Sequence, residues 1–245
     1  MKENVEKTEL FSYILKYKNN LPQEILSIEK KYLNRHTNRL LFSAKLVDEI
    51  AGRRKLKVLD VGIHAGYLAY LLKSRGHEVY GVDEDMHAFW GKRFASEHIE
   101  FSVCNLVREN LPFKDEEFDV VTFLEVIEHL PVLPNLVLQE LKRVLKKGGF
   151  LILSTPNPLS FRSRVTILLG RWPYSSGGHF RLYPIDELTF LIKKVGLNIT
   201  RIEYRTFDFL HMSLLHKILS FIRRVGNWIF PRLRDYIVLI ACKGF

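Results

Sequence analysis

Short apolar runs alternate with amphipathic stretches along most of the chain. Five runs between residues 56 and 156 read as strands: KVLDV, EVYGVD, IEFSVCN, FDVVTFLEV and FLILSTP. Helical stretches or glycine-containing turns separate them, and this alternation is typical of a parallel sheet covered by helices on both faces. Two later runs, LNITRIEYRTF and DYIVLIACKGF, add further strands. The pattern therefore predicts an α/β fold with a doubly wound, mostly parallel sheet.

Helical spacing dominates the rest of the chain. Apolar residues recur at Leu40, Leu41, Ala44, Val47 and Ile50, so residues 1–55 are expected to form an N-terminal helical cap divided near a proline. Further helices are expected at residues 67–75, 86–97, 131–147 and 184–195. Residues 56–245 would then form the main domain, with a long substrate loop at 157–182 and an inserted basic amphipathic helix at 208–231.

Length and composition limit the class of protein. The chain has 245 residues and is 47% hydrophobic, which suits one large domain with decorations. Two cysteines far apart in sequence indicate neither a metal motif nor a disulfide framework. The charged first residues lack the apolar stretch of a signal peptide, and the apolar runs are too short to span a membrane. We therefore expect a cytoplasmic protein, soluble or membrane-associated at the periphery.

The net charge of +10 is unevenly distributed. Residues 1–55 carry +5, residues 56–155 carry −4, and residues 156–245 carry +9. A contact with an anionic membrane or with nucleic acid is therefore expected at the flanks. The amphipathic segment at 208–231 suits an anionic membrane interface, a cover over the substrate pocket, or ordinary packing on the domain, and nucleic acid is the least favoured partner.

A glycine-bearing turn follows the first strand, in the stretch LDVGIHAGY. The dinucleotide fingerprint G-x-G-x-x-G fails there, because His64 and Tyr67 occupy two of its glycine positions. The pattern D-x-G-x-G-x-G fits better, since Asp60, Gly62 and Gly66 match it at every position except His64. The histidine either crowds the ligand or points away from it.

With its downstream motifs, this turn resembles that of the class I S-adenosylmethionine-dependent methyltransferases. An acidic residue ends the second strand in VYGVDED, and CNLVRENLPFKDEEFDVV and LKKGGFLILSTPN resemble the later family segments. The resemblance implies a Rossmann-like seven-stranded sheet with an antiparallel last strand, and S-adenosylmethionine as the methyl donor. It also implies cofactor contacts at Asp60, Gly62, His64, Gly66, Asp83, Glu84, Asn105, Leu106 and Glu125.

A second candidate site follows the fourth strand, in FLEVIEHLP. Glu125, Glu128 and His129 have the i, i+3, i+4 spacing that places residues on one helix face, and His179 lies in the expected substrate loop. Two carboxylates and imidazoles are able to bind a divalent ion such as Mg²⁺. The set resembles metal-dependent O-methyltransferases, including ubiquinone-pathway and small-RNA 3′-terminal enzymes. We therefore expect Glu125, Glu128, His129 and His179 as metal ligands, with His129 and Glu128 acting in catalysis.

These observations favour methylation of a hydroxyl group. The expected acceptor is a small molecule, a lipid or lipid-linked compound, or a glycan-like compound. Two alternatives stay open at this point. His64 and Asn105 depart from the usual pattern, which favours a catalytically weak binding or membrane-scaffold protein of the same fold. The +9 charge of the last third instead favours an RNA methyltransferase.

Overall fold

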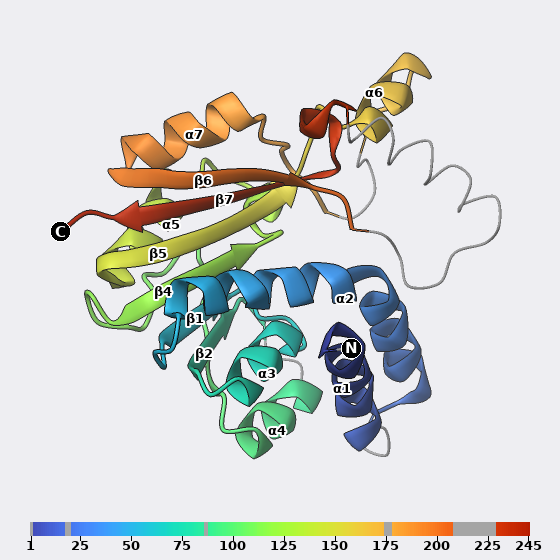
Figure 1. The fold of residues 1–245 in the computed structure, drawn as a ribbon, viewed down its shortest axis with the longest axis vertical. Helices are drawn as coiled ribbons and strands as arrows, with labels where there is room; N and C mark the ends of the chain where they lie inside the picture. The colour runs from blue at the N-terminus through green and yellow to red at the C-terminus, as the bar shows by residue number, and fades with distance from the viewer. Residues whose placement is uncertain (1, 18–20, 86–87, 174–177, 208–228) are drawn as a thin grey trace. The chain divides into compact units, whose positions relative to one another are not determined.

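The computed structural model describes residues 2–17, 21–85, 88–173, 178–207 and 229–245 (Figure 1). The described residues divide into two compact units. The first comprises residues up to Val103 together with Phe207, and the second comprises Cys104 to Thr206 with residues 229–245. Among the described residues, no helix is both long enough and apolar enough to cross a bilayer.

Seven strands form one mixed sheet in the order β3-β2-β1-β4-β5-β7-β6. They are β1 (Lys57–Val61), β2 (Glu78–Asp83), β3 (Glu100–Val103), β4 (Phe118–Leu124), β5 (Leu145–Pro156), β6 (Leu197–Arg205) and β7 (Tyr236–Lys243). β2 pairs in parallel with β1 and β3, and β4 pairs in parallel with β5, whereas β7 runs antiparallel to β5 and β6. The predicted seven-stranded, Rossmann-like sheet with an antiparallel last strand is confirmed.

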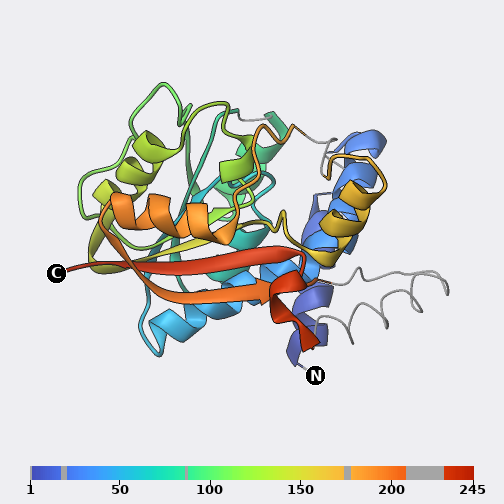
Figure 2. The same cartoon turned by 90° about the horizontal axis from the view of Figure 1, so that it is seen from above.

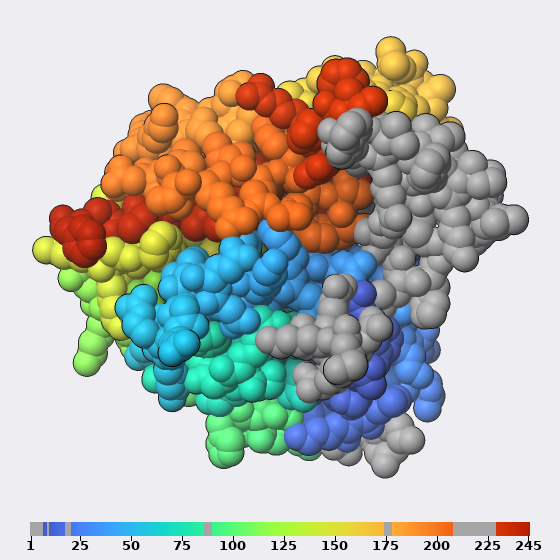
Figure 3. Space-filling view, in the orientation of Figure 1, coloured from blue at the N-terminus to red at the C-terminus, as the bar shows by residue number. Residues whose placement is uncertain are grey.

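The first unit holds α1 (Lys2–Lys16), α2 (Gln23–Ala51), α3 (Tyr67–Ser74) and α4 (Ala88–Ser96). α2 begins after Pro22 and ends at Gly52, whose φ of 61° suits a residue without a side chain. Its buried residues Leu26, Leu33 and Leu40 recur at the expected helical spacing, which confirms the predicted N-terminal helices. This stripe faces the rest of the unit, and the space-filling view shows α2 beside α3 (Figure 3).

The second unit contains α5 (Asn135–Val144), α6 (Phe161–Leu168), α7 (Ile185–Lys194) and the short 3₁₀ helices η2 (Ile127–His129) and η3 (Pro231–Leu233). α5 and α7 lie side by side, as seen from above in Figure 2. Lys142 Nζ on α5 donates to the Val195 carbonyl, 2.8 Å away, just after α7. That hydrogen bond joins the two helices at their carboxyl ends.

Two sequence expectations need correction, and one lies outside the described residues. The helix expected at 131–147 spans only Asn135–Val144, because Leu145 is already extended and pairs with Phe118 in the sheet. The loop expected at 157–182 contains α6, which begins where the Ser160 side chain accepts the Ser163 N–H. Most of the amphipathic helix expected at 208–231 falls on residues 208–228, outside the part of the chain that the structure describes.

Candidate functional site

The glycine turn after β1 is built on backbone conformations that favour glycine. Gly62 and Gly66 have φ angles of 79° and 76°, in the left-handed region. A Cβ on Gly66 would lie 2.3 Å from Cε1 of Phe94, so only glycine fits there without displacing the ring. The Gly62 N–H donates to the Val82 carbonyl at 2.8 Å and so ties the turn to β2. These constraints explain the spacing of the two glycines.

Asp83 organises the turn from the end of β2. Its Oδ2 accepts the backbone N–H of His64 at 2.8 Å, and its Oδ1 accepts the Glu84 N–H at 2.9 Å. A carboxylate oxygen accepts more than one hydrogen bond, so Asp83 retains capacity for two vicinal hydroxyls of a ligand. Asp60 lies in β1 opposite Gly81 and is buried. The turn and both aspartates therefore come together in the first unit as expected.

The His64 side chain packs against the N-terminal helices. Its backbone has a φ of 50°, which is unusual for a residue with a side chain. The ring stacks on Tyr32 of α2 with 4.9 Å between centroids and 20° between planes. Desolvation in this stack lowers the pKa of His64, and the Asp83 carboxylate acts in the opposite direction. The sequence left open whether the His64 side chain crowds the ligand or points away from it. In the structure the His64 ring contacts α2.

A buried ion pair behind the turn was missed by sequence reasoning. Arg93 of α4 and Glu29 of α2 are almost fully buried and form two parallel hydrogen bonds of 3.0 Å each. The Tyr67 hydroxyl also donates to Glu29, at 2.7 Å, and Arg93 Nη1 donates to the Ala65 carbonyl at 3.3 Å. Arg93 therefore joins α2 directly to the glycine turn. The sequence contained one indication of this ion pair: the charged residue Glu29 interrupts the apolar stripe of α2.

In the second unit, Asn105 and Leu106 follow β3 and are both half-buried. The Asn105 side-chain oxygen accepts the Val107 N–H at 3.1 Å in a local turn, and the Asn105 N–H donates to Glu109 Oε2 at 3.2 Å. The oxygen is thus engaged within the loop, so the amide nitrogen is the end of Asn105 that suits a ligand acceptor atom.

Glu125 follows β4 in a strained conformation. Its φ is 57°, and nothing about a glutamate side chain favours that region. Ser154 of β5 holds it there, because the Ser154 carbonyl accepts the Glu125 N–H at 2.9 Å and the Ser154 hydroxyl donates to Glu125 Oε1 at 2.7 Å. Strain of this kind costs about 1–3 kcal/mol and is concentrated at functional sites.

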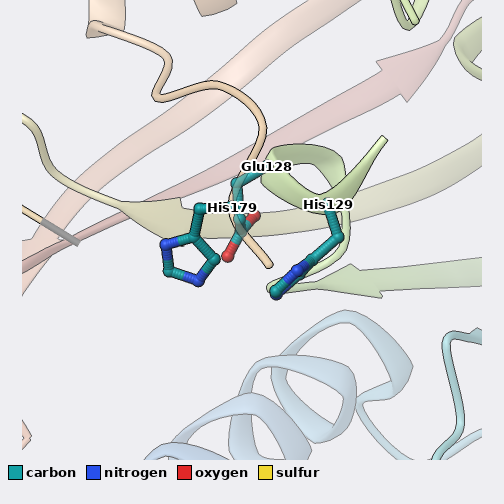
Figure 4. Close-up of side chains that lie close together, drawn as sticks. All are labelled: Glu128, His129 and His179. Atoms are coloured by element: carbon teal, nitrogen blue, oxygen red, sulfur yellow. The ribbon is translucent and has the colours of Figure 1, made fainter. Parts of the chain in front are cut away.

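Three of the four expected metal ligands come together. Candidate ligand atoms of Glu128, His129 and His179 all lie within 4.8 Å of one another (Figure 4). The rings of His129 and His179 meet edge to face, with 4.6 Å between centroids. Thr155 Oγ1 donates to Glu128 Oε2 at 3.0 Å, and Glu128 is fully buried. Glu125 is not part of this cluster; its carboxylate contacts Ser154 instead.

A hydrogen bond fixes the proton position on the His129 ring, and burial favours the neutral form of His179. His129 Nδ1 lies 3.1 Å from the Gly178 carbonyl, which only accepts, so Nδ1 carries a proton and Nε2 is the ligand atom of the neutral ring. Desolvation, with a smaller effect of His129, lowers the pKa of His179 and favours its neutral form. The segment after Gly178 is held in place because the Glu128 carbonyl accepts the N–H groups of Phe180 and Arg181.

Tyr183 is a second residue that the sequence did not single out. Its side chain is fully buried, and its hydroxyl has no hydrogen-bond partner within the described part of the chain. Burial raises the pKa of Tyr183, partly opposed by Arg181, so the phenol stays protonated at neutral pH. The sequence contained one indication that Tyr183 belongs to the site, since it follows His179 by four residues in the same segment.

A family model described as a methyltransferase domain matches residues 33–202, more than half of the chain. The match includes the glycine turn, Asp83 and the Glu128 cluster. The chain therefore belongs to the class I S-adenosylmethionine-dependent methyltransferases, a family of enzymes.

Individual relatives agree with this family. A probable S-adenosylmethionine-dependent methyltransferase of Mycobacterium tuberculosis is 33% identical over 171 residues, which cover 70% of this chain and 57% of the relative. A ubiquinone biosynthesis O-methyltransferase of Glaesserella parasuis is 29% identical over 134 residues, covering 52% and 56%. The chain thus spans somewhat more than half the length of these curated relatives. The crystal structure of an S-adenosylmethionine-dependent methyltransferase from Archaeoglobus fulgidus covers 91% of this chain and 100% of that one, with a TM-score of 0.63 and 19% identity, which shows the fold alone.

Proposed function

We propose that the protein transfers the methyl group of S-adenosylmethionine to a hydroxyl of its acceptor, and that a divalent ion at Glu128, His129 and His179 holds that hydroxyl. The observation that carries the proposal is the convergence of these three ligand types within 4.8 Å. The similarity to ubiquinone biosynthesis O-methyltransferases supports a hydroxyl acceptor.

The residues of the glycine turn fit the methyl donor. S-adenosylmethionine supplies an already activated methyl group, so positioning contributes much of the rate. Asp83 presents a carboxylate suited to ribose hydroxyls, and the turn keeps its backbone close to the ligand by using glycine at 62 and 66. Asp60, His64, Glu84, Asn105, Leu106 and Glu125 remain our proposed additional contacts. His64 would act through its backbone, because its ring packs on α2.

The Glu128 cluster fits a divalent ion. Two imidazoles and one carboxylate form a common set of three ligands that leaves coordination positions open for an acceptor. Ligands held at about 2.1 Å from one ion lie at most about 4.2 Å from each other. Atoms within 4.8 Å therefore need only a small side-chain shift to bind together. A divalent ion such as Mg²⁺ would lower the pKa of the acceptor hydroxyl.

The chain's own groups also serve a proton transfer. The Nδ1–H group of His129 donates a hydrogen bond to the Gly178 carbonyl, so Nε2 carries no proton in the neutral ring and is able to accept one. The low pKa of His179 keeps that ring neutral near pH 7. Thr155 orients Glu128 from β5. These interactions hold the three side chains ready for either direct deprotonation or metal binding.

The acceptor is proposed by class only: a small molecule, a lipid or lipid-linked compound, or a glycan. We propose that residues 157–182 and the N-terminal cap of residues 1–55 select it. The two cysteines are free, which is compatible with our proposal of a cytoplasmic location.

The test is methyl transfer from radiolabelled S-adenosylmethionine to a panel of hydroxyl acceptors, with and without EDTA. We expect EDTA to abolish transfer and added Mg²⁺ or Mn²⁺ to restore it. His129→Asn is expected to reduce kcat by about 10²-fold or more, as is typical of a lost acid–base group. The matched control is His98→Asn, which changes an exposed histidine in the first unit. Activity that survives both EDTA and His129→Asn undiminished refutes the proposal.

A further inference from the structure

α6 and the residues after it expose nearly all of their large apolar side chains. The exposed fraction is 85% for Leu168, 73% for Leu169 and 68% for Trp172, and about half for Phe161 and Ile167. A helix of a globular domain normally turns such residues toward the core. A group of exposed apolar residues at this density marks an interaction site. Atoms of α6 are visible at the surface in the space-filling view (Figure 3).

Small polar groups, not these apolar side chains, attach α6 to its unit. Ser163 is fully buried, and its hydroxyl donates to the Asn157 carbonyl at 3.2 Å. The Asn157 amide donates to the carbonyls of Arg232 and Arg234 at 2.9 and 2.7 Å, which fixes the start of the helix beside η3. The apolar side chains are therefore not needed to hold α6 in place, and they remain available to a partner.

The charged residues within α6 and the segments that flank it in sequence all have one sign. Arg162, Arg164 and Arg171 are exposed, and none of them belongs to an ion pair recorded among the described residues. The sequence contains no acidic residue between Glu140 and Asp186. Arginines that flank exposed leucines and a tryptophan are the combination that favours an anionic lipid interface. There the apolar groups leave water, and each cation strengthens binding by about fivefold.

We propose that this surface, formed by Phe161, Ile167, Leu168, Leu169 and Trp172 with Arg162, Arg164 and Arg171, binds the protein to an anionic bilayer. The apolar side chains enter the headgroup region, and the arginines contact lipid phosphates. A second copy of the chain is a poorer partner, because it would bring two sets of arginines together without a counter-charge. The inference goes beyond the proposed methyl transfer, since vesicle binding is measured without any reaction.

The experiment is sedimentation of the full chain with vesicles of phosphatidylcholine alone or mixed with phosphatidylglycerol. We expect binding to the mixed vesicles only, and weaker binding as salt is added. The double substitution Leu168→Ser, Leu169→Ser is expected to weaken partitioning about tenfold or more, because it removes the apolar groups that would enter the bilayer. Its matched control is Leu136→Ser, which changes a leucine on α5 that is 71% exposed.

Charge is tested separately. Arg171→Gln is expected to weaken binding to the mixed vesicles by about fivefold, whereas Lys193→Gln on α7, also exposed, leaves it unchanged. Tryptophan emission should shift to the blue on vesicle addition in the wild type and shift less in Trp172→Phe. The proposal is overturned if the wild type stays in the supernatant with both vesicle types, or if the Leu168, Leu169 variant binds as well as the wild type. It is equally overturned if that substitution only dissociates a dimer.

Discussion

Replacing Glu29 by glutamine tests the buried network behind the glycine turn. The substitution keeps the shape of the side chain but removes the charge that neutralises Arg93, which is only 1% exposed. Breaking one partner of a buried ion pair costs about 3–5 kcal/mol. The free energy of unfolding of a typical protein is about 5–15 kcal/mol, so a substantial part of the stability would be lost. With a urea slope of about 3 kcal/mol per M, the unfolding midpoint should fall by about 1–1.7 M.

Urea unfolding followed by tryptophan fluorescence measures this loss, because the Trp90 ring lies 4.6 Å from the Arg93 guanidinium carbon. Glu24→Gln on the same helix is the control; Glu24 is exposed, and we expect a change within about 0.5 kcal/mol. The double variant Glu29→Leu, Arg93→Met should be more stable than Glu29→Gln, because it leaves no buried charge. An unfolding midpoint in Glu29→Gln equal to that of the control would refute this account of the network.

Two further predictions concern histidines of the first unit. His64→Gly should bind S-adenosylhomocysteine with an affinity within about threefold of the wild type, as measured by calorimetry. Glycine keeps the backbone N–H that Asp83 accepts, and it suits the φ of 50°. A tenfold loss of affinity would instead place the His64 ring in the cofactor site. Burial, reinforced by nearby arginines, lowers the pKa of His36 to about 3. In the unfolded chain His36 therefore binds a proton near pH 6.5, whereas in the folded chain it stays neutral down to about pH 3. The free energy of unfolding thus falls as the pH drops from about 6.5 towards 3, by up to about 1.4 kcal/mol per pH unit. Urea midpoints measured across this range should fall less steeply in His36→Asn, and equal slopes would contradict the assignment.

The sheet was predictable because its strands are apolar runs of the right length, separated by helices and turns. The positions of the turn glycines and of Asp83 were predictable because they lie at or after the ends of the apolar runs that form β1 and β2, whereas contact of these residues with the cofactor stays a prediction. The Glu128 cluster was partly predictable: close spacing indicated Glu128 and His129, whereas His179 was included because it lies in the expected substrate loop.

Features that depend on distant contacts were not predictable from the sequence. The direction of the His64 ring is set by Tyr32, which lies more than thirty residues earlier on α2. Arg93 resembles an ordinary surface residue of α4 until Glu29 is placed beside it. The sequence pattern did not predict α6, because its leucines and arginines do not separate into a buried and an exposed face. The helix end at Val144 was obscured because the pairing of Leu145 with Phe118 depends on the sheet.

The most direct test of the account is calorimetric titration with S-adenosylhomocysteine, the demethylated product of the donor. We expect one binding site in the wild type and a loss of affinity of about tenfold or more in Asp83→Ala, because two hydrogen-bonded hydroxyls lose a charged acceptor. Asp85→Ala, which changes an exposed aspartate two residues later, should bind as the wild type does. Absence of measurable binding in the wild type, or equal affinity in Asp83→Ala, would contradict the assignment of the glycine turn as the cofactor site.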